Sequence, residues 1–587
     1  CHRLSVIGIP PHMIKPFVRL YLEWVTHNGP EWAVKRFKSL KVDLIRQHSN
    51  LSSITPYVRK NRSGGYWGII GALFRWSKRG EKQFSRALQA FCIYTSEVSE
   101  VETKSQLHKF LSAVSCSTPT GLSLESLSRI SWTAMRVIGR QSITRVDNRL
   151  ITYRGSSEKF APLPHNQGTC AQDRKVLHEL TWMRNMKNLS FIMKHWSLYS
   201  LVFRGVGQIT NHHPIEQLDL TSYAGEIHFI QEPGYKLRAV ASPYRIHQLA
   251  LQPLGTSLGR IVQSLPWDCT FDQSKAFPVI QEKLRSGCTV HSLDLSNATD
   301  FFPLEIQMVV LRTIFGDIPD IQLFQDISRM TWKSEYGDIQ WGRGQPLGLF
   351  PSFFAFTMTH GLVLHTLCEH RENEFLIIGD DVVIFSDDLY KKYVEFLNAI
   401  SCPYSLEKSL SSSSAAEFAG KVVTPDSVIP QLKWRKMSND SFLDLAKLLG
   451  RRSRSLMTKR QQRVFDAVMH LLPPVGLNMS TPSSNLLSSF METEKFLASS
   501  TQRSVASLTG LSRIIRNNSM DDPSAHILDV DTRAFDEKVL MVFQKTVFSH
   551  WKWLEQVSDL PQALGLEPRL PIKACPRRVS TLRRYED

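Results

Sequence analysis

The sequence predicts an α+β protein of several subdomains, in which short strands alternate with longer helices. Three observations favour this fold class. Strand-like apolar runs alternate with longer helical segments from about residue 223 to 421. The remainder, from about residue 422, has mostly helical periodicity. The chain has 587 residues, which is too long for a single hydrophobic core. The hydrophobic content of 42% and the charged content of 21% are those of a globular chain.

The first part of the chain, to about residue 210, mixes helical stretches with basic and aromatic residues. The densest mixture is a cluster made of Arg59, Lys60, Arg62, Tyr66, Trp67, Arg75, Trp76, Lys78 and Arg79. Its basic groups could meet phosphates while its rings stack on unpaired bases. A solvated loop anchored by buried tryptophans explains the same residues, and the sequence leaves both interpretations open.

A basic hairpin arm is predicted around residues 231–241. Lys236 and Arg238 alternate with apolar residues there, so both side chains point to one face of the strand. Two cations on one face suit a triphosphate, and an arginine can hold phosphate through two hydrogen bonds. Arg245 follows on a predicted helix and could join them. The alternative is an ordinary solvated strand face.

A strand, a turn and a helix are predicted over residues 290–315. Asp294 ends the strand, at a sheet edge open to a ligand, and the periodic segment Leu304–Phe315 follows Pro303. An aspartate in such a place is usually a turn or helix-capping residue. Taken alone, Asp294 is therefore better explained by that structural role.

A glycine-rich segment follows at residues 341–352, where Gly344, Gln345 and Ser352 are candidate ligand-contacting residues. From Gly344 to Cys368 the chain contains no Asp, Glu, Lys or Arg and so imitates a membrane span. Its prolines and glycines favour a buried loop followed by a buried helix. We therefore expect no stable membrane span.

A tight β-hairpin with carboxylates at its tip is predicted at residues 375–385. Two apolar runs flank Gly379, Asp380 and Asp381. Two carboxylates about 4 Å apart repel by about 4 kcal/mol at an effective dielectric of about 20, which a divalent cation would relieve. A solvated surface turn is the alternative for this motif taken alone.

The combination of the two acidic elements changes this balance. A strand-end Asp294 and the hairpin-tip pair Asp380 and Asp381 can converge on two Mg²⁺ ions, with Mn²⁺ as an alternative metal. An amphipathic helix is predicted at residues 387–400. Lys408 beyond it is either a general acid for a leaving pyrophosphate or a surface lysine.

The composition favours a polyanionic partner. Lys and Arg number 71 and Asp and Glu 54, a formal net charge of +17, which suits binding to RNA, although a basic protein without such a partner remains the alternative. The nine cysteines are dispersed and none are spaced as C-x-x-C, which predicts free thiols and no zinc site. The first residue is Cys1, so we expect a fragment or a processed product.

The motifs occur in the order found in the RNA-directed RNA polymerases of narnaviruses and mitoviruses, which the chain resembles from about Gly225 to Gly450. The matching motifs are the Lys236-x-Arg238 arm, Thr270–Gln273, Asp294–Asp300, Gly344–Gly348, Gly379–Asp381, Leu406–Ser409 and Glu417–Lys421. The narnavirus-like group is favoured by Lys433-Trp434-Arg435 with Ser438, Ser441 and Phe442.

The resemblance implies a right-hand polymerase fold. Residues 1–210 would form an N-terminal region and part of the fingers, 211–285 the fingers with the basic arm, 286–421 the palm, and 422–587 a mostly helical thumb and basic C-terminal region. The palm would contain an antiparallel sheet with flanking helices. The partners would be an RNA template, the product strand and ribonucleoside triphosphates, acting on a monomer in the host cytoplasm or, alternatively, the host mitochondrion.

The resemblance also assigns roles. Asp294 and Asp380 would be the principal metal ligands and Asp381 an auxiliary one. Asp300 would sense the ribose 2′-hydroxyl with help from Ser352. Two departures from the broader polymerase pattern concern this ribose site: the second acidic residue stands one position further from the first, and Thr357, Thr359 and His360 occur where that pattern offers an asparagine.

Three functions from different classes follow. The leading hypothesis is RNA-templated synthesis of RNA. A reverse transcriptase using deoxynucleotides is the second, and Asp300 argues against it because a ribose-sensing site needs a polar group. A non-enzymatic RNA-binding protein is the third, and it leaves the clustered carboxylates unexplained.

Overall fold

The computed structural model describes residues 1–54, 65–143, 153–154, 159–160, 182, 185–206, 222–405, 409–434, 449–459, 462, 465–466 and 469. The chain forms two compact units. The first unit comprises residues 1–29, 60–96 and 432–587, and the second comprises residues 30–59 and 97–431. Each is described by itself.

The described part of the first unit is helical. Its elements are α1 (His2–Ile7), α2 (Pro11–Asn28), α4 (Gly68–Ser77), α5 (Glu81–Phe91) and the 3₁₀ segments η1 (Cys92–Ser96) and η7 (Gly450–Leu456). Phe17, Phe74 and Phe91 pack edge to face in its core. Of the predicted basic and aromatic cluster, Trp76 is buried, as the anchoring interpretation requires, whereas Trp67 is 58% exposed.

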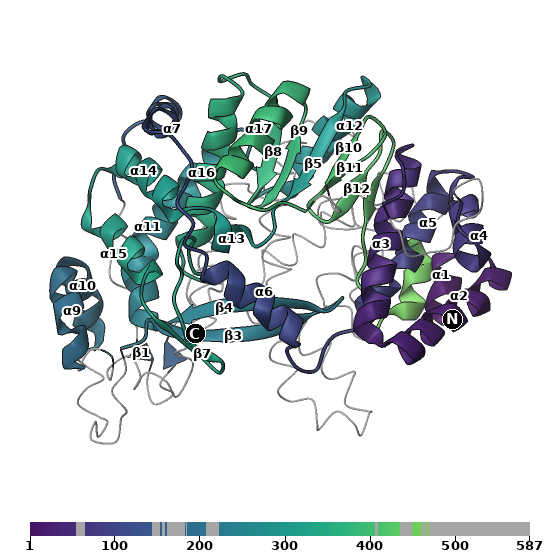
Figure 1. Ribbon diagram of the computed structural model, residues 1–587, viewed down its shortest axis with the longest axis horizontal. Helices are drawn as coiled ribbons and strands as arrows, with labels where there is room; N and C mark the ends of the chain where they lie inside the picture. Colours follow the sequence, from purple (N-terminus) through teal and green to yellow (C-terminus); the bar gives the residue numbers. More distant parts are fainter. Residues whose placement is uncertain are drawn as a thin grey trace, which may run out of the picture. The chain divides into compact units, whose positions relative to one another are not determined.

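The second unit contains the remaining helices (Figure 1). They are α3 (Pro30–His48), α6 (Lys104–Val114), α7 (Leu124–Val137), η4 (Met186–Asn188), α9 (Leu189–Lys194), α10 (Trp196–Val206), α11 (Arg245–Ser264), η6 (Gln273–Lys275), α12 (Ala276–Arg285), α13 (Ala298–Phe301), α14 (Leu304–Phe315), α15 (Pro319–Ser328), α16 (Ser352–Leu367) and α17 (Asp387–Ala399).

The same unit contains the strands β1 (Tyr153–Arg154), β2 (Lys159–Phe160), β3 (Gly225–Glu232), β4 (Lys236–Pro243), β5 (Val290–Asp294), β6 (Trp332–Ser334), β7 (Gly337–Ile339), β8 (Phe375–Ile378), β9 (Asp381–Ile384), β10 (Leu410–Ser412), β11 (Ala416–Phe418), β12 (Lys421–Val423) and β13 (Val428–Pro430). One sheet has the order β10-β5-β9-β8 and is antiparallel throughout. A second has the order β4-β3-β6-β7, with β3 and β6 parallel. The antiparallel strands β11, β12 and β13 form a third.

The sheet β10-β5-β9-β8 is buried on both faces. Ile377 and Val382 belong to the core cluster shared with α14, α16 and α17, whereas Leu376 and Val383 belong to the cluster shared with α12, β11 and β12. The strands are apolar on both faces because side chains alternate between two packed layers. Figure 1 shows α16 and α17 beside β8 and β9, and α12 on the other side of the sheet.

The α+β class with antiparallel sheets is confirmed, and so are the local predictions within the described residues. The hairpin at residues 375–385 is β8–β9, the strand, turn and helix at 290–315 are β5, α13 and α14, and the buried loop before a buried helix is residues 344–351 followed by α16. The amphipathic helix is α17, with Leu389, Tyr393 and Leu397 fully buried. The fourfold division of the chain into fingers, palm and thumb stays a prediction.

Two findings concern the apolar segments and the cysteines of the described residues. Among the described helices, none has both the length and the apolar character needed to cross a bilayer. The described cysteines, which are Cys1, Cys92, Cys116, Cys269, Cys288, Cys368 and Cys402, are free thiols.

Candidate active site

The acidic turn, defined as Gly379, Asp380 and Asp381, closes the β8–β9 hairpin. Ile378 pairs with Asp381, so Gly379 and Asp380 form a two-residue loop. Gly379 has φ 58°, as expected at the first central position of a type II′ turn, which matches the twist of the flanking strands. A Cβ at Gly379 would stand 2.8 Å from Phe353 Cε2, so glycine is required both for the backbone and for the contact with α16.

Asp294 lies beside this turn. It is the last residue of β5 and is the register partner of Asp381 on β9. Directly opposed residues in an antiparallel pair have Cβ atoms about 5 Å apart, so the two carboxylates leave the same edge of the sheet. Asp294 and Asp381 are half-buried and Asp380 is exposed. Asp294, although distant in the chain, therefore lies beside Asp381 at the end of the hairpin whose loop contains Asp380.

The donor chemistry of this edge fits magnesium bound jointly with substrate. Within the described residues, no three His, Cys, Asp or Glu side chains form a group that could hold a metal ion by themselves. Mg²⁺ in phosphoryl-transfer sites is usually held by one or two carboxylates together with phosphates and water, and not by a closed protein cage. The hard oxygen donors of Asp294, Asp380 and Asp381 suit that mode of binding.

The predicted ribose site and the glycine-rich loop form one connected structure. Gln345 donates from its backbone N–H to Thr299 O at 2.8 Å and from Nε2 to Ser352 O at 2.9 Å. A Cβ on Gly344 would lie 2.1 Å from Thr299 O and 2.4 Å from Asp300 O. Gly344 thus allows the loop to press against the backbone of α13, and the space it frees is filled by the protein itself.

Asp300 is buried and held by an indole. Its Oδ1 accepts a hydrogen bond from Trp341 Nε1 at 2.9 Å. Burial raises the pKa of Asp300 to about 6, and the hydrogen bond from Trp341 offsets this only in part. Ser352 is also buried, and its hydroxyl donates to Pro346 O at 2.9 Å. Trp341 is the first residue of the glycine-rich segment, but the sequence did not indicate its hydrogen bond to Asp300.

Arg329 organises the same loop and was missed by sequence analysis. Its guanidinium donates to the carbonyls of Trp341, Arg343 and Gly344 at 2.9–3.0 Å and to Glu305 Oε1 at 2.8 Å. Three carbonyls held by one planar group fix the entry of the loop. The chain contains 71 lysines and arginines, and nothing local distinguishes Arg329 among them.

The basic arm is the hairpin β3–β4, but its cations are already engaged. Arg238 donates from Nε to Glu232 Oε1 at 3.1 Å, and Lys236 Nζ lies 3.9 Å from Glu232 Oε2. The arm meets the glycine-rich loop further along β4, where Ala241 N donates to Leu347 O at 2.8 Å. At about 3.3 Å per residue, Arg238 stands about 10 Å along the strand from that junction.

Two predicted site residues cannot be placed. Lys408 lies outside the described residues. Arg245 begins α11, and its side chain also lies outside the described part of the chain. Their assigned roles stay predictions.

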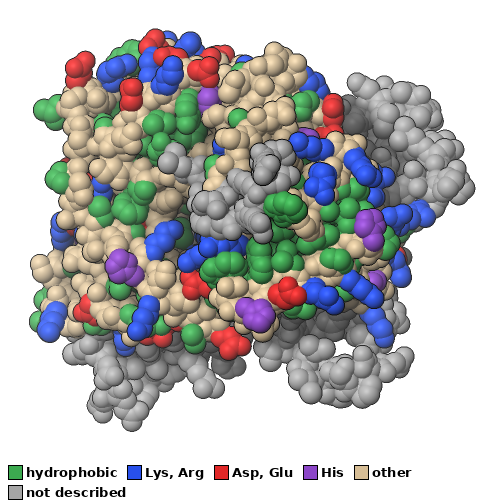
Figure 2. All heavy atoms as spheres, turned by 45° about the vertical axis from the view of Figure 1, so that its right-hand side comes forward, with side chains coloured by type: hydrophobic (Ala, Val, Ile, Leu, Met, Phe, Trp, Pro, Cys, Tyr) green, Lys and Arg blue, Asp and Glu red, His purple; other side chains and the backbone are tan. Residues whose placement is uncertain are grey.

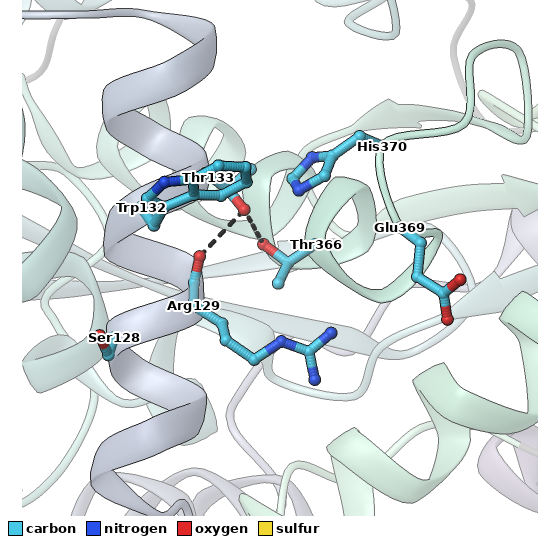
Figure 3. Close-up of a pocket in the computed structure, with 7 residues that line it drawn as sticks. All are labelled: Ser128, Arg129, Trp132, Thr133, Thr366, Glu369 and His370. Atoms are coloured by element: carbon cyan, nitrogen blue, oxygen red, sulfur yellow. Dashed lines mark hydrogen bonds between the residues drawn. The ribbon is translucent and has the colours of Figure 1, made fainter.

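The far end of α16 is tied to α7, away from the acidic turn. Thr366 Oγ1 lies 2.9 Å from Thr133 Oγ1, and Thr133 donates to the carbonyl of Arg129 (Figure 3). A hollow beside them is lined by Ser128, Arg129, Trp132, Thr133, Thr366, Glu369 and His370. None of the predicted site residues lines this hollow.

Comparison with known proteins finds sequence similarity to viral polymerases. Residues 165–443, somewhat under half of the chain, match the family model described as mitovirus RNA-dependent RNA polymerase. Within the chain, 204 residues are 28% identical to the RNA-directed RNA polymerase of Cryphonectria parasitica mitovirus 1. Residues 165–443 are therefore similar in sequence to mitovirus RNA-dependent RNA polymerases. The preference for the narnavirus-like group stays a prediction.

The matches to individual proteins cover only parts of the chain or are distant in sequence. The match to the mitovirus polymerase spans 34% of this chain and only 25% of that protein. An uncharacterized mitochondrial protein of Arabidopsis thaliana is 26% identical over 173 residues, which are 27% of this chain and 68% of the plant protein. Among solved structures, BmCPV RNA-dependent RNA polymerase at elongation state has 11% identity and a TM-score of 0.42, covering 68% of this chain and 40% of the other.

Proposed function

We propose that this chain is an RNA-directed RNA polymerase that replicates a viral RNA genome. It would join ribonucleotides along an RNA template, using ribonucleoside triphosphates and releasing pyrophosphate in a magnesium-dependent reaction. The observation that carries the proposal is the register of β5 against β9, which sets Asp294 opposite Asp381 beside Asp380. This geometry occurs within the segment that is similar to mitovirus polymerases.

The acidic edge, defined as Asp294, Asp380 and Asp381, would hold the metal. Asp294 and Asp380 are the proposed principal ligands and Asp381 the auxiliary one. Bound there, Mg²⁺ supplies neutralisation of the triphosphate charge and lowers the cost of forming the attacking and leaving oxyanions. The carboxylates themselves orient the site, since they project from the paired ends of two strands inside a buried sheet.

The remaining residues would bind and select the nucleotide. Asp300 Oδ1 accepts from Trp341, which leaves Oδ2 as the acceptor for a ribose hydroxyl. Lys236 and Arg238, with Arg245, are the proposed triphosphate ligands. To serve in this way, Arg238 must exchange Glu232 for phosphate oxygens. Lys408 is the proposed general acid that protonates the leaving pyrophosphate.

The decisive test removes the acidic edge one residue at a time. D294A and D380A should each lower templated RNA synthesis at least about 10³-fold, because loss of several kcal/mol of charge stabilisation corresponds to that factor. RNA binding should stay within about twofold, since that binding depends mainly on phosphate contacts with Lys and Arg. D426A is the matched control, because Asp426 is an exposed aspartate between β12 and β13. Full synthesis by D294A or D380A would reject the proposal.

The same assay separates the other candidate functions. A polymerase of this kind should extend an RNA template with ribonucleotides and should reject deoxynucleotides, whereas a reverse transcriptase would prefer deoxynucleotides. A simple RNA-binding protein would yield salt-sensitive binding and no magnesium-dependent product. Replacing Mg²⁺ by Mn²⁺ should preserve synthesis, because both ions favour oxygen ligands.

The state and location of the protein are also proposed. We propose that the polymerase is a monomer acting in the host cytoplasm, with the host mitochondrion as the alternative. The sequence matches to a mitovirus polymerase and to a plant mitochondrial protein favour testing that alternative first. Light scattering of the purified chain and fractionation of host cells for template-dependent activity address these two points separately.

A further inference from the structure

His360 lies in the middle of α16 and is fully buried, and both nitrogens of its ring have partners. Nδ1 lies 2.9 Å from the carbonyl oxygen of Gly379, in the acidic turn. Nε2 lies 2.5 Å from the hydroxyl of Tyr393, which is fully buried on α17. One side chain therefore connects two helices to the backbone of the turn that presents Asp380.

The partners fix where the proton of the ring lies. A carbonyl oxygen can only accept a hydrogen bond, so Nδ1 must carry the proton and donate to Gly379. Nε2 is then the acceptor, and the hydroxyl of Tyr393 donates to it. Burial lowers the pKa of His360 to about 4 and raises that of Tyr393, so both groups are neutral in this arrangement.

Aromatic neighbours hold the ring in this orientation. The ring centroid of Phe356 is 5.3 Å from that of His360, and the rings of His360 and Tyr393 are stacked at 5.7 Å. Phe302 packs against it at 6.0 Å. A rotamer change would have to displace packed core side chains, so the bond to Gly379 is preset by the core.

We propose that His360 is a positioning residue for the acidic turn, and that Tyr393 sets its tautomer. The inference rests on the proposed polymerase function. Gly379 precedes Asp380 directly, so a carbonyl held from α16 limits where the carboxylate can move. Asp381 is fixed by its pairing with Asp294, whereas Asp380 lies in the loop itself and depends more on such a restraint.

The test compares His360 with a buried polar residue on the same helix that does not touch the turn. Thr366 is that residue, because its hydroxyl contacts Thr133 and the carbonyl of Leu362 at the other end of α16. H360F removes both ring hydrogen bonds, and H360N keeps a short donor for Gly379 but cannot reach Tyr393. Y393F removes only the hydroxyl, and T366V removes only the distant contact.

We expect H360F to lower kcat by at least about tenfold, since a shift of about 1 Å in a reacting group costs up to about 10²-fold. The KM for nucleotide should change little, and the Mg²⁺ concentration for half-maximal synthesis should rise. H360N should recover part of kcat, and Y393F should lie between H360N and the unchanged protein. T366V should lower the melting temperature but leave kcat and the Mg²⁺ requirement within about twofold.

A second readout does not depend on synthesis. Amide hydrogen exchange across residues 378–382 should accelerate in H360F and Y393F but not in T366V, and Mn²⁺ affinity measured by calorimetry should fall in H360F. If the unchanged protein makes no RNA, the polymerase proposal fails while the exchange data still test the restraint. Unchanged exchange and kcat in folded H360F and Y393F variants, together with an unchanged metal affinity in H360F, would overturn the inference.

Discussion

The two hairpins that carry the predicted site residues are fixed in different ways. The β8–β9 hairpin lies within a sheet buried on both faces. The carbonyl of Gly379 in its two-residue turn accepts a hydrogen bond from the buried side chain of His360. The β3–β4 arm is longer and more exposed, and its tip is tied by Gly234 N to the carbonyl of Glu97 and by Gln106 Nε2 to the carbonyl of Tyr235. The acidic hairpin is a core element, and the basic arm is a surface element.

The two hairpins also differ in how their charge is arranged. The acidic turn and β5 set Asp294 opposite Asp381, next to Asp380, and this concentration of negative charge suits a cation bound jointly with substrate. On the arm, Glu232 accepts from Arg238 and lies near Lys236, so much of the positive charge is balanced within the hairpin. Negative charge is thus concentrated at the proposed metal site. The positive charge of Lys236 and Arg238 is partly neutralised by Glu232 until a ligand replaces that carboxylate. On the face drawn in Figure 2, Lys and Arg side chains lie among Asp and Glu side chains.

Among substitutions that leave the three acidic residues in place, the largest effect is expected from the turn glycine. G379A places a Cβ 2.8 Å from Phe353 Cε2 and forces alanine to φ 58°. We expect templated synthesis to fall about 10²-fold, because the turn must shift by a fraction of an ångström to about 1 Å. G420A is the matched control, since Gly420 has φ 69° at the β11–β12 turn and nothing lies within 4 Å of its Cβ position.

Both glycine variants should lose about 1–2 kcal/mol of stability from the left-handed backbone, measured by urea unfolding. Only G379A should lose synthesis. The double variant G379A/F353L should recover part of the activity by relieving the contact. Equal activity in G379A and G420A would mean that the acidic hairpin tolerates displacement like a surface loop, and the comparison between the hairpins would fail.

A second effect concerns the pH dependence of folding. The folded pKa of Asp300 is raised to about 6 from an ordinary value of 3.8, so the folded state binds this proton more tightly than the unfolded state. The stabilisation is therefore complete below about pH 4 and is lost as pH rises through about 6. The cost of the buried carboxylate at pH 7 is of the order of 3 kcal/mol, at 1.36 kcal/mol for each pKa unit.

D300N tests this directly, because an amide oxygen can still accept from Trp341 without carrying charge. We expect D300N to be more stable than the unchanged chain at pH 7–8, by up to about 3 kcal/mol, and equally stable near pH 4. Urea unfolding between pH 4 and 8 measures the difference, with D426N at an exposed position as control. Because Asp268 also has a pKa raised to about 6, the difference between variants is the informative quantity. A pH-independent difference would contradict the assignment.

The sequence predicted the acidic side of this comparison better than the basic side. Apolar runs around Gly379 to Asp381 are local signals, since a two-residue loop between strands is determined by neighbours in the chain. The strand ending at Asp294 was likewise visible, and its convergence with the hairpin-tip pair was expected because three carboxylates could share bound cations. The register that sets Asp294 opposite Asp381 was not predicted. These features depend on short-range pattern and on chemistry, both of which a single sequence contains.

What sequence could not supply is the set of contacts between distant residues. The bonds from Trp341 to Asp300, from Arg329 to the glycine-rich loop, and from His360 to Gly379 join groups 12 to 41 positions apart. Each depends on how helices and loops pack, and tryptophan, arginine and histidine are common enough that residue type alone selects none of them. The balancing of Arg238 by Glu232 was also unforeseen, although the two residues are close in the chain.

The smallest effect is expected on the basic arm, and it decides what the arm is for. If Arg238 binds triphosphate, R238A should raise the KM for nucleotide about tenfold, and E232Q should lower it a few-fold by removing the competing carboxylate. If the pair is only structural, both variants should lose the same small stability, within about 1 kcal/mol for an exposed ion pair, with no change in KM. Opposite shifts in KM at low salt, shrinking as salt is raised, would mark the arm as a nucleotide-binding surface. Parallel shifts would leave the β3–β4 hairpin as a scaffold and move the search for triphosphate ligands to Arg245 and Lys408.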